Sequence, residues 1–298
     1  MHQHLWPEPL VEALRRRRSA PRLEGWELHL DGEPACPVDP AAHDLAARRA
    51  TDRADGVDLT LLSLSAPLGI ERLPAAESAP LLEAWHGLAD HLDDGHGLWA
   101  APRLVEPDPC ELAATLAHPR VHGLQVPADA LATPGRLEAL APTLAVAEAA
   151  GLPVLVHPGP AAPTAEALPS WWPALTSYVA QQAAAWHAWH VAGRALLPTL
   201  RVVFVGLAGL APLHHERLTQ RGGSLGVIDP GVFYETSSYG GRAVDAMARV
   251  VGVDPLVLGS DRPYAVATDL AADPGLGEAF ARAVRSTNPL HLLQGGPR

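Results

Sequence analysis

The sequence predicts a (β/α)8 barrel, because short apolar runs of strand length alternate with helical patterns along most of the 298 residues. Strands that alternate with helices are joined as parallel βαβ units. Eight such units in about this length indicate a closed barrel with its helices outside. We expect one domain over residues 1–298, and a doubly wound open sheet is the alternative.

The elements follow in order after an HQH segment at residues 2–4. Residues 7–18 form a helical pattern. Residues 20–39 predict a small β-hairpin insertion, with Asp31-Gly32 as its turn, and Asp39 is expected to cap the next helix over 40–53. The remaining expected strands lie near 57–64, 97–101, 121–126, 152–157, 200–206, 231–236 and 254–260, and the expected helices between them near 79–92, 110–118, 135–151, 173–196, 212–223 and 241–252.

Composition excludes several classes of function. The formal net charge of −11 argues against nucleic-acid binding, and the basic run Arg15–Arg18 is interpreted as the cationic end of a helix, with a nucleic-acid patch as the weaker alternative. No apolar run has membrane-spanning length and no signal-peptide pattern is present, so we expect a cytoplasmic protein that uses no membrane. Cys36 and Cys110 are too few for a disulfide framework or a thiolate metal site.

The chain contains no lysine, so all 22 of its cationic side chains are arginines. This excludes a Schiff-base lysine, a phosphate-loop lysine and a carbamylated lysine that bridges two metals. No dinucleotide fingerprint or nucleophile elbow is present either.

Four polar residues predict one metal site. His2 and His4 have the i, i+2 spacing that puts two imidazoles on one face of a strand, and His157 and Asp261 each end an apolar run before a turn. Carboxyl ends of barrel strands meet at one rim, where barrels carry their chemistry. Taken singly, these residues could instead be a frayed terminus, a core histidine and a helix cap; together, three imidazoles and a carboxylate suit one divalent cation.

The motifs HQHLWP, VLVHPG, YETSSYG, GSDRP and the closing STNPLHLL give a family resemblance. With them the chain resembles the amidohydrolase-related group of the amidohydrolase superfamily, which includes aminocarboxymuconate-semialdehyde decarboxylase. The resemblance covers essentially the whole chain. It implies a single divalent metal, usually zinc, bound by His2, His4, His157 and Asp261, and the missing lysine agrees because this group needs no carbamate bridge.

Two positions depart from that group. In similar proteins the sixth strand ends in a histidine that polarises or protonates the substrate, whereas Gly206 stands there in this chain. The nearest substitutes are His214 and His215, or the pair His187 and His190, although surface or helix-packing histidines are the expected interpretation of all four. Similar proteins also have several strand residues before HxH, so we expect a frayed first strand and a natural start upstream of Met1.

The expected substrate is a small molecule. The candidate residues for its binding are Trp6, Trp171, Trp172, Tyr178, Glu235 and Arg262. Trp6 is expected at the barrel mouth, Glu235 could instead support a ligand imidazole, and Arg262 could pair with a substrate carboxylate or with a neighbouring acid.

Metal-dependent hydrolysis of an amide, lactone or ester is the leading expectation. A bound cation lowers the pKa of its water from about 16 to about 7. Asp261, with His157 as the other catalytic candidate, would touch the metal and move the proton. Non-oxidative decarboxylation of a small aromatic or unsaturated acid is the alternative, and a metal-binding barrel without catalysis is the third. A homo-oligomer stays possible.

Overall fold

A curled sheet of eight parallel strands forms the centre of the computed structural model, which describes residues 2–31, 33–164, 166, 168–273 and 275–295. In spatial order the strands are β1 (Gln3–His4), β5 (Thr60–Ser63), β6 (His96–Ala100), β7 (Val121–Pro127), β8 (Val154–His157), β9 (Val202–Phe204), β10 (Val232–Glu235) and β11 (Leu256–Val257). The two edges meet just after β11. There the amide of Asp261 donates to the carbonyl of His2 at 3.2 Å, and the amide of His4 donates to the carbonyl of Arg262. This is the curled parallel arrangement that a (β/α)8 barrel requires.

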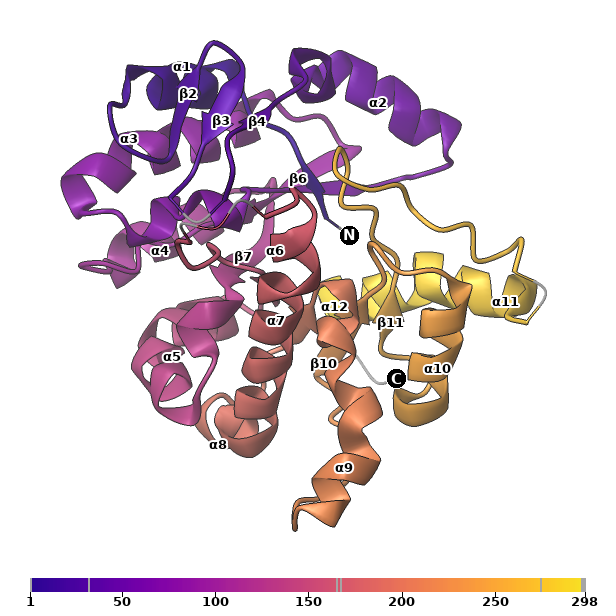
Figure 1. Cartoon of the computed structure of the whole chain (residues 1–298). Helices are drawn as coiled ribbons and strands as arrows, with labels where there is room; N and C mark the ends of the chain where they lie inside the picture. Colours follow the sequence, from indigo (N-terminus) through magenta and orange to yellow (C-terminus); the bar gives the residue numbers. More distant parts are fainter. Residues whose placement is uncertain (1, 32, 165, 167, 274, 296–298) are drawn as a thin grey trace.

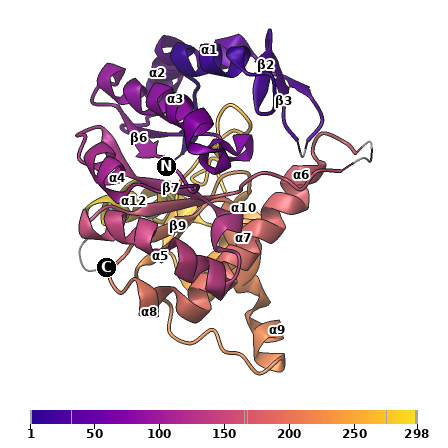
Figure 2. The same cartoon turned by 90° about the vertical axis from the view of Figure 1, so that its left-hand side faces the viewer.

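Helices surround the sheet (Figure 1; Figure 2). They are α1 (Glu8–Arg16), α2 (Leu45–Ala54), α3 (Ala75–His86), α4 (Pro109–Leu116), α5 (Pro134–Ala149), α6 (Trp172–Leu175), α7 (Ser177–Ala188), α8 (Arg194–Leu196), α9 (His215–Gln220), α10 (Gly241–Val251), α11 (Gly277–Arg282) and α12 (Asn288–Gln294). Within the described residues, none of these helices is long and apolar enough to cross a membrane.

The start of α2 corrects one sequence prediction. Asp39 caps a short 3₁₀ turn over Pro40–His43 by accepting the amide of Ala41, and it does not cap the long helix. The carboxylate of Asp44 caps α2 by accepting the amides of Ala46 and Ala47 at 2.7 and 3.0 Å. A second acidic residue therefore restarts the helix five residues later than expected.

A small antiparallel sheet follows α1. It comprises β2 (Arg22–Glu24), β3 (Glu27–His29) and β4 (Cys36–Pro37). The tight turn lies at Gly25-Trp26, where Gly25 has a φ of +62°. Asp31 of the expected Asp31-Gly32 turn lies in the longer connection of the antiparallel pair β3–β4, and Gly32 lies outside the described residues.

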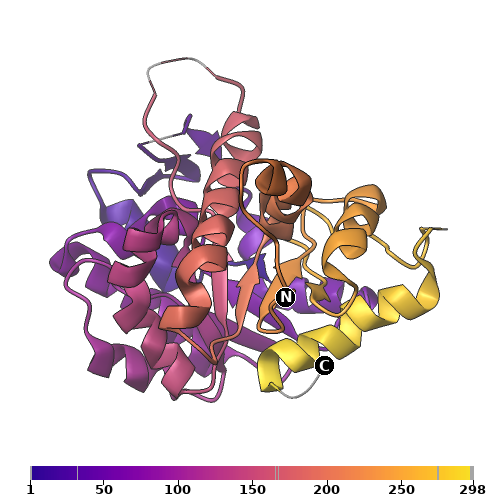
Figure 3. The same cartoon turned by 90° about the horizontal axis from the view of Figure 1, so that it is seen from below.

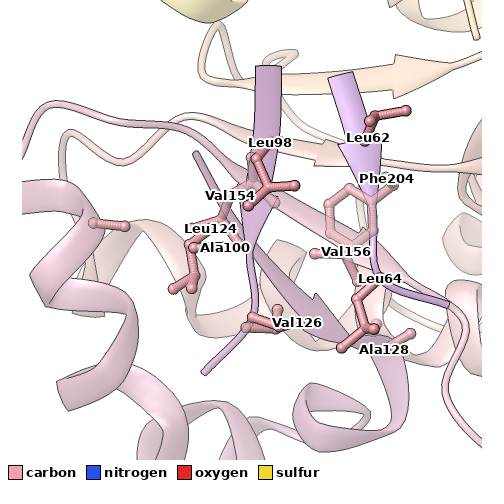
Figure 4. Close-up of a cluster of buried hydrophobic side chains, with 14 of the residues drawn as sticks. Leu62, Leu64, Leu98, Ala100, Leu124, Val126, Ala128, Val154, Val156 and Phe204 are labelled. Atoms are coloured by element: carbon pink, nitrogen blue, oxygen red, sulfur yellow. The ribbon is translucent and has the colours of Figure 1, made fainter. Parts of the chain in front are cut away.

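Alternating side chains on the strands form an inner and an outer core. Leu61, Trp99, Leu155, Val203, Val205, Phe233 and Val257 form the inner cluster, together with Leu292 from α12. The C-terminal helix α12, yellow in Figure 3, thus contributes to the interior of the barrel. Leu62, Leu98, Leu124, Val154 and Phe204 belong to the outer cluster between strands and helices (Figure 4).

The tight packing of the inner cluster predicts that a methyl group added at Gly123 destabilises the protein. A Cβ added at Gly123 of β7 would lie 2.2 Å from the ring of Trp99 and 2.6 Å from the carbonyl of Pro153. Because overpacking a dense core strains it, we expect Gly123→Ala to lower the free energy of unfolding by about 1–3 kcal/mol in chemical denaturation. Gly135→Ala is the matched control, since a Cβ there meets nothing within 4 Å. Equal stability of the two variants would contradict this packing.

Candidate metal centre

Three separate parts of the chain bring His2, His4, His157 and Asp261 together at the carboxyl edge of the sheet. His2 and His4 belong to the first strand segment, His157 ends β8, and Asp261 follows β11. One possible ligand atom from each of the four residues lies within 4.8 Å of the others. The convergence predicted from the sequence is therefore present in the geometry.

The three imidazoles surround the Asp261 carboxylate. Asp261 Oδ1 lies 3.2 Å from His2 Nε2 and 3.1 Å from His4 Nε2. The three ring centroids are 5.0–5.4 Å apart, with interplanar angles of 78–88°. The imidazoles are at most 6% exposed, whereas the side chain of Asp261 is 23% exposed, so the cluster reaches solvent on the side of the carboxylate.

The second nitrogen of each imidazole faces an acceptor. Nδ1 of His4 donates to the carbonyl of Ser63 at 3.0 Å, and Nδ1 of His157 donates to the carbonyl of Pro158 at 2.9 Å. Nδ1 of His2 lies 3.1 Å from Glu235 Oε1. Such contacts fix the ring orientation and leave Nε2 free to bind a metal. The donor set of three imidazole nitrogens and one carboxylate fits a single divalent cation.

Burial and charge together set the protonation of this cluster. Burial disfavours a charged His2, but the nearby carboxylates of Glu235 and Asp261 outweigh it and raise the pKa of His2 to about 9. Burial raises the pKa of Asp261, but contacts with His2 and His4 lower it more, so its pKa lies well below the usual range. Burial and its neighbours lower the pKa of His157 well below 6.5.

Glu235 supports His2 from the end of β10. Its Oε2 accepts the amide of Gly206 at 3.3 Å, the amide of Ser237 at 3.2 Å and the Ser237 hydroxyl at 2.6 Å. A Cβ added at Gly259 would lie only 0.9 Å from Glu235 Oε1, so glycine is required there. This position beside the His2 imidazole is the one that the supporting role considered for Glu235 requires, and contact of Glu235 with a substrate stays a prediction.

Gly206 begins a left-handed turn. Residues 206–210 all have φ between +51° and +62°, and Leu207, Ala208 and Leu210 are not glycines. Such backbone costs roughly 1–2 kcal/mol per non-glycine residue. A histidine at position 206 would share this strained φ, whereas a glycine adopts it without that cost.

The histidines considered as substitutes make other contacts. Nδ1 of His187 pairs with the carbonyl of Ala183 at 2.7 Å, and Nε2 of His190 pairs with the carbonyl of Ser224 at 2.8 Å. His214 and His215 lie at the junction of a 3₁₀ turn and α9. No contact described for these four histidines reaches the cluster, and His190 and His214 are exposed, which agrees with the surface or packing roles expected of them.

Two expected substrate contacts have other partners. Trp6 is only 1% exposed, donates to the Ser65 hydroxyl at 3.1 Å and stacks on His43, so it presents no free face. Arg262 pairs with Asp55 at 2.5 Å and lies 3.6 Å from Asp52, so it is the structural bridge that the sequence left as an alternative. Both side chains are held by their neighbours within the barrel wall.

The other expected contacts remain accessible. Trp171 and Trp172 are 54% and 39% exposed, and their rings lie 5.7 Å apart beside α6. The Tyr178 hydroxyl donates to the carboxylate of Glu33, which comes from the small antiparallel sheet. Sequence reasoning missed Glu33 because no periodicity or motif marks an acid in a loop.

Sequence reasoning also missed a buried acid, Glu71. It is inaccessible to solvent, and burial raises the pKa of its carboxyl to about 7. Glu71 follows β5 and stands next to Arg72, a sequence typical of an exposed charged turn. Its burial is therefore evident only in the folded structure.

The comparisons with known proteins support the fold. No family model and no curated protein matches this sequence. Among solved structures, the IDCase of Metarhizium anisopliae is 18% identical with a TM-score of 0.81, covering 98% of this chain and 96% of its own. The 5-carboxyvanillate decarboxylase of Sphingomonas paucimobilis is 18% identical, with a TM-score of 0.71 and 98% of each chain covered.

A third neighbour has a bound metal. The 5-carboxyvanillate decarboxylase of Novosphingobium aromaticivorans, a D314N mutant with manganese and a nitrobenzoic acid, is 17% identical with a TM-score of 0.69; 83% of this chain and 80% of that chain are covered. These neighbours confirm, at the level of the fold, the resemblance that the sequence motifs indicated.

The raised pKa of His2 predicts proton release on metal binding. Without a cation His2 holds a proton at neutral pH, and a metal ligand must be neutral, so binding at pH 7.5 should release about one proton. Calorimetric titration with zinc in buffers of different ionisation enthalpy measures this number. A binding enthalpy that does not depend on the buffer would contradict the protonated state.

The buried Glu71 predicts a pH-dependent stability. Its folded pKa of about 7 exceeds the ordinary 4.5, so the folded state binds the extra proton and its stability falls as pH rises from about 4.5 through 7. We expect Glu71→Gln to remove this loss and to stabilise the protein above pH 7 by up to about 3 kcal/mol. Thermal unfolding at pH 5 and pH 8 measures the difference. A gain of equal size at both pH values would argue against a neutral buried acid.

Proposed function

We propose that this chain is a metal-dependent decarboxylase of a small aromatic or unsaturated carboxylic acid. The observation that carries the proposal is the His2, His4, His157 and Asp261 cluster at the carboxyl edge of the barrel. These four side chains would hold a divalent cation, which would supply Lewis-acid chemistry to an acidic substrate. The decarboxylase activity named for two structural neighbours supports this choice of reaction.

The named activity of the neighbours sets the order of the two candidate reactions. Two of the neighbours reported above are named as decarboxylases, and one of these contains manganese. Hydrolysis on the same cluster would need a base whose pKa lies near the working pH. Decarboxylation needs no such base, because the carbon–carbon bond breaks heterolytically once the acid is held. We therefore place decarboxylation before hydrolysis, in the reverse of the order expected from the sequence.

The remaining parts of the site are proposed in the same terms. Zinc is the first candidate because the donor set is rich in imidazole, and manganese is the second because a neighbour contains it. Trp171 and Trp172 are proposed to offer apolar faces to the ring of the substrate. The exposed side of Asp261 marks where that substrate enters.

Loss of one ligand tests the function. The protein loaded with zinc or manganese should release CO2 from at least one member of a panel of ortho-hydroxy aromatic and unsaturated acids. His157→Ala should lose most of the bound metal in elemental analysis and lower CO2 release by at least about a hundredfold, because the cation is held by too few ligands.

His187→Ala is the matched control, since its imidazole contacts a helix carbonyl and not the cluster. It should keep both metal and activity. Hydrolysis of lactones, esters or amides without CO2 release would instead favour the hydrolase. Bound metal without turnover on either panel would favour a barrel that has no catalytic activity.

A further inference from the structure

Decarboxylation leaves an electron pair on carbon, so a proton must arrive there. The residues nearest the cluster are poorly suited to give it. Asp261 accepts from His2 and His4, Glu235 accepts from two amides and a hydroxyl, and Gly206 has no side chain. We therefore look for a donor among the groups farther out, on the open side of the cluster.

Helix α7 is fastened over the end of β8, where His157 lies. Gln181 accepts the amide of Gly159 at 2.7 Å and donates to the carbonyl of Pro160 at 2.8 Å. Gln182 donates to the carbonyl of Val156 at 2.9 Å. These contacts direct one face of α7 toward the strand that carries the ligand.

The left-handed turn after β9 also positions α7. A Cβ at Gly209 would lie 2.4 Å from the carbonyl oxygen of Val179, so only glycine lets the two backbones approach this closely. The turn that begins at Gly206 therefore abuts the start of α7. Gly209, three residues after Gly206, is thus packed against Val179, the neighbour of Tyr178 in α7.

Tyr178 lies one turn before Gln182, on the same face of α7. Its hydroxyl donates to Glu33 in the β3–β4 connection, so the small antiparallel sheet is joined to α7 on this side of the barrel (Figure 2). Tyr178 also interacts electrostatically with Asp261 and Tyr264. The Tyr264 ring lies 5.5 Å from the ring of His4, which ties this group of side chains to the cluster.

We propose that the Glu33 carboxyl and the Tyr178 hydroxyl form the proton-delivery pair of this site. The inference rests on the proposed decarboxylase function. Tyr178 is the member that would touch the substrate, and Glu33 acts through Tyr178 as a positioning and proton-supplying residue. Both residues are half-buried, so Glu33 can regain its proton from solvent.

The step balances as follows. The bond between the ring carbon and the carboxylate breaks, its electron pair stays on carbon, and CO2 leaves. The Tyr178 hydroxyl gives its proton to that carbon while Glu33, protonated at the start, gives its own proton to the Tyr178 oxygen. Glu33 ends as the carboxylate that accepts from Tyr178, which is the arrangement in the structure.

The protonation of both groups suits this order of events. Burial raises the pKa of Glu33, although the Tyr178 hydroxyl lowers it in part. Burial and Glu33 raise the pKa of Tyr178 far above its usual range, so a free phenolate is unfavourable there. The hydroxyl can therefore give up its proton only while Glu33 supplies another to the same oxygen. The other titratable groups that face the pair are Cys36, Tyr264 and Asp261.

Two variants test the pair, with CO2 release, substrate affinity and metal content measured on each. We expect Tyr178→Phe and Glu33→Gln to lower kcat by about a hundredfold or more, the usual contribution of a general acid, with bound metal unchanged and substrate affinity within threefold. In the wild-type protein kcat should fall as Glu33 loses its proton at higher pH, and Glu33→Gln should lack that limb. Glu27→Gln is the matched control, because Glu27 lies in the same small sheet and pairs with His29.

A second measurement needs no turnover. In a 13C NMR titration of labelled glutamate, the signal that Glu33→Gln removes should titrate above 4.5 and move higher in Tyr178→Phe, because the hydroxyl that stabilises the carboxylate is gone. If the pKa of Glu33 is ordinary and does not change in Tyr178→Phe, the proton-delivery pair is wrong. If the wild-type protein releases CO2 and both variants keep its kcat, the proton-delivery pair is wrong while the proposed function stands. Absence of CO2 release by the wild type on the whole panel overturns the proposed function and the pair with it.

Discussion

The carboxyl end of this barrel depends on one constraint: three nearly inaccessible imidazoles must remain oriented around a single carboxylate. Packing alone does not fix the orientation of an imidazole ring, so each ring needs an acceptor for its second nitrogen. Two strand-end carbonyls, of Ser63 and Pro158, serve His4 and His157, and Glu235 serves His2. Gly259 exists as glycine because Glu235 fills the space beside it. The support of the ligands thus accounts for sequence features that carry no chemistry themselves.

Much of this arrangement could be predicted because it follows from periodicity. Strand patterns that end in a polar residue before a turn identify the carboxyl edge, and parallel strands bring those ends together whatever their distance in the chain. His157 and Asp261 were found in this way. Asp39 and Asp44 are both good caps, however, and nothing local decides which one begins the longer helix. Arg262 had two possible partners, and only the fold places Asp52 and Asp55 beside it.

Glu33 and Glu71 could not have been selected from the sequence, for a physical reason. The protonation of a carboxyl depends on its solvation, which long-range packing determines. Glu71 follows an ordinary strand, yet the fold removes it from water; Glu33 lies in a loop, yet it meets a tyrosine 145 residues away. The sequence shows that position 206 is a glycine, but it does not predict the left-handed turn that begins there. Leu207, Ala208 and Leu210 are residues that rarely adopt a positive φ, so nothing local indicates this backbone.

The first strand, β1, explains why the charged side chains of Arg48 and Asp52 are buried next to it. A two-residue strand makes too few ladder bonds to fix His2 and His4, so side chains must hold it from outside. Gln3, which faces away from the cluster, donates to Asp52 at 3.0 Å and accepts from Arg48 at 2.8 Å, and Arg48 also donates to the carbonyl of His4.

Buried ion pairs contribute little net stability, since desolvation offsets their attraction. Their value here is positional: Asp52 binds Gln3 on β1 and lies beside Arg262, the neighbour of Asp261, so one carboxylate sets the distance between the first two ligands and the last. Arg262 therefore helps to hold the segment that carries Asp261. A site assembled from both ends of the chain needs such a tie, because the barrel closes where β1 meets the segment after β11.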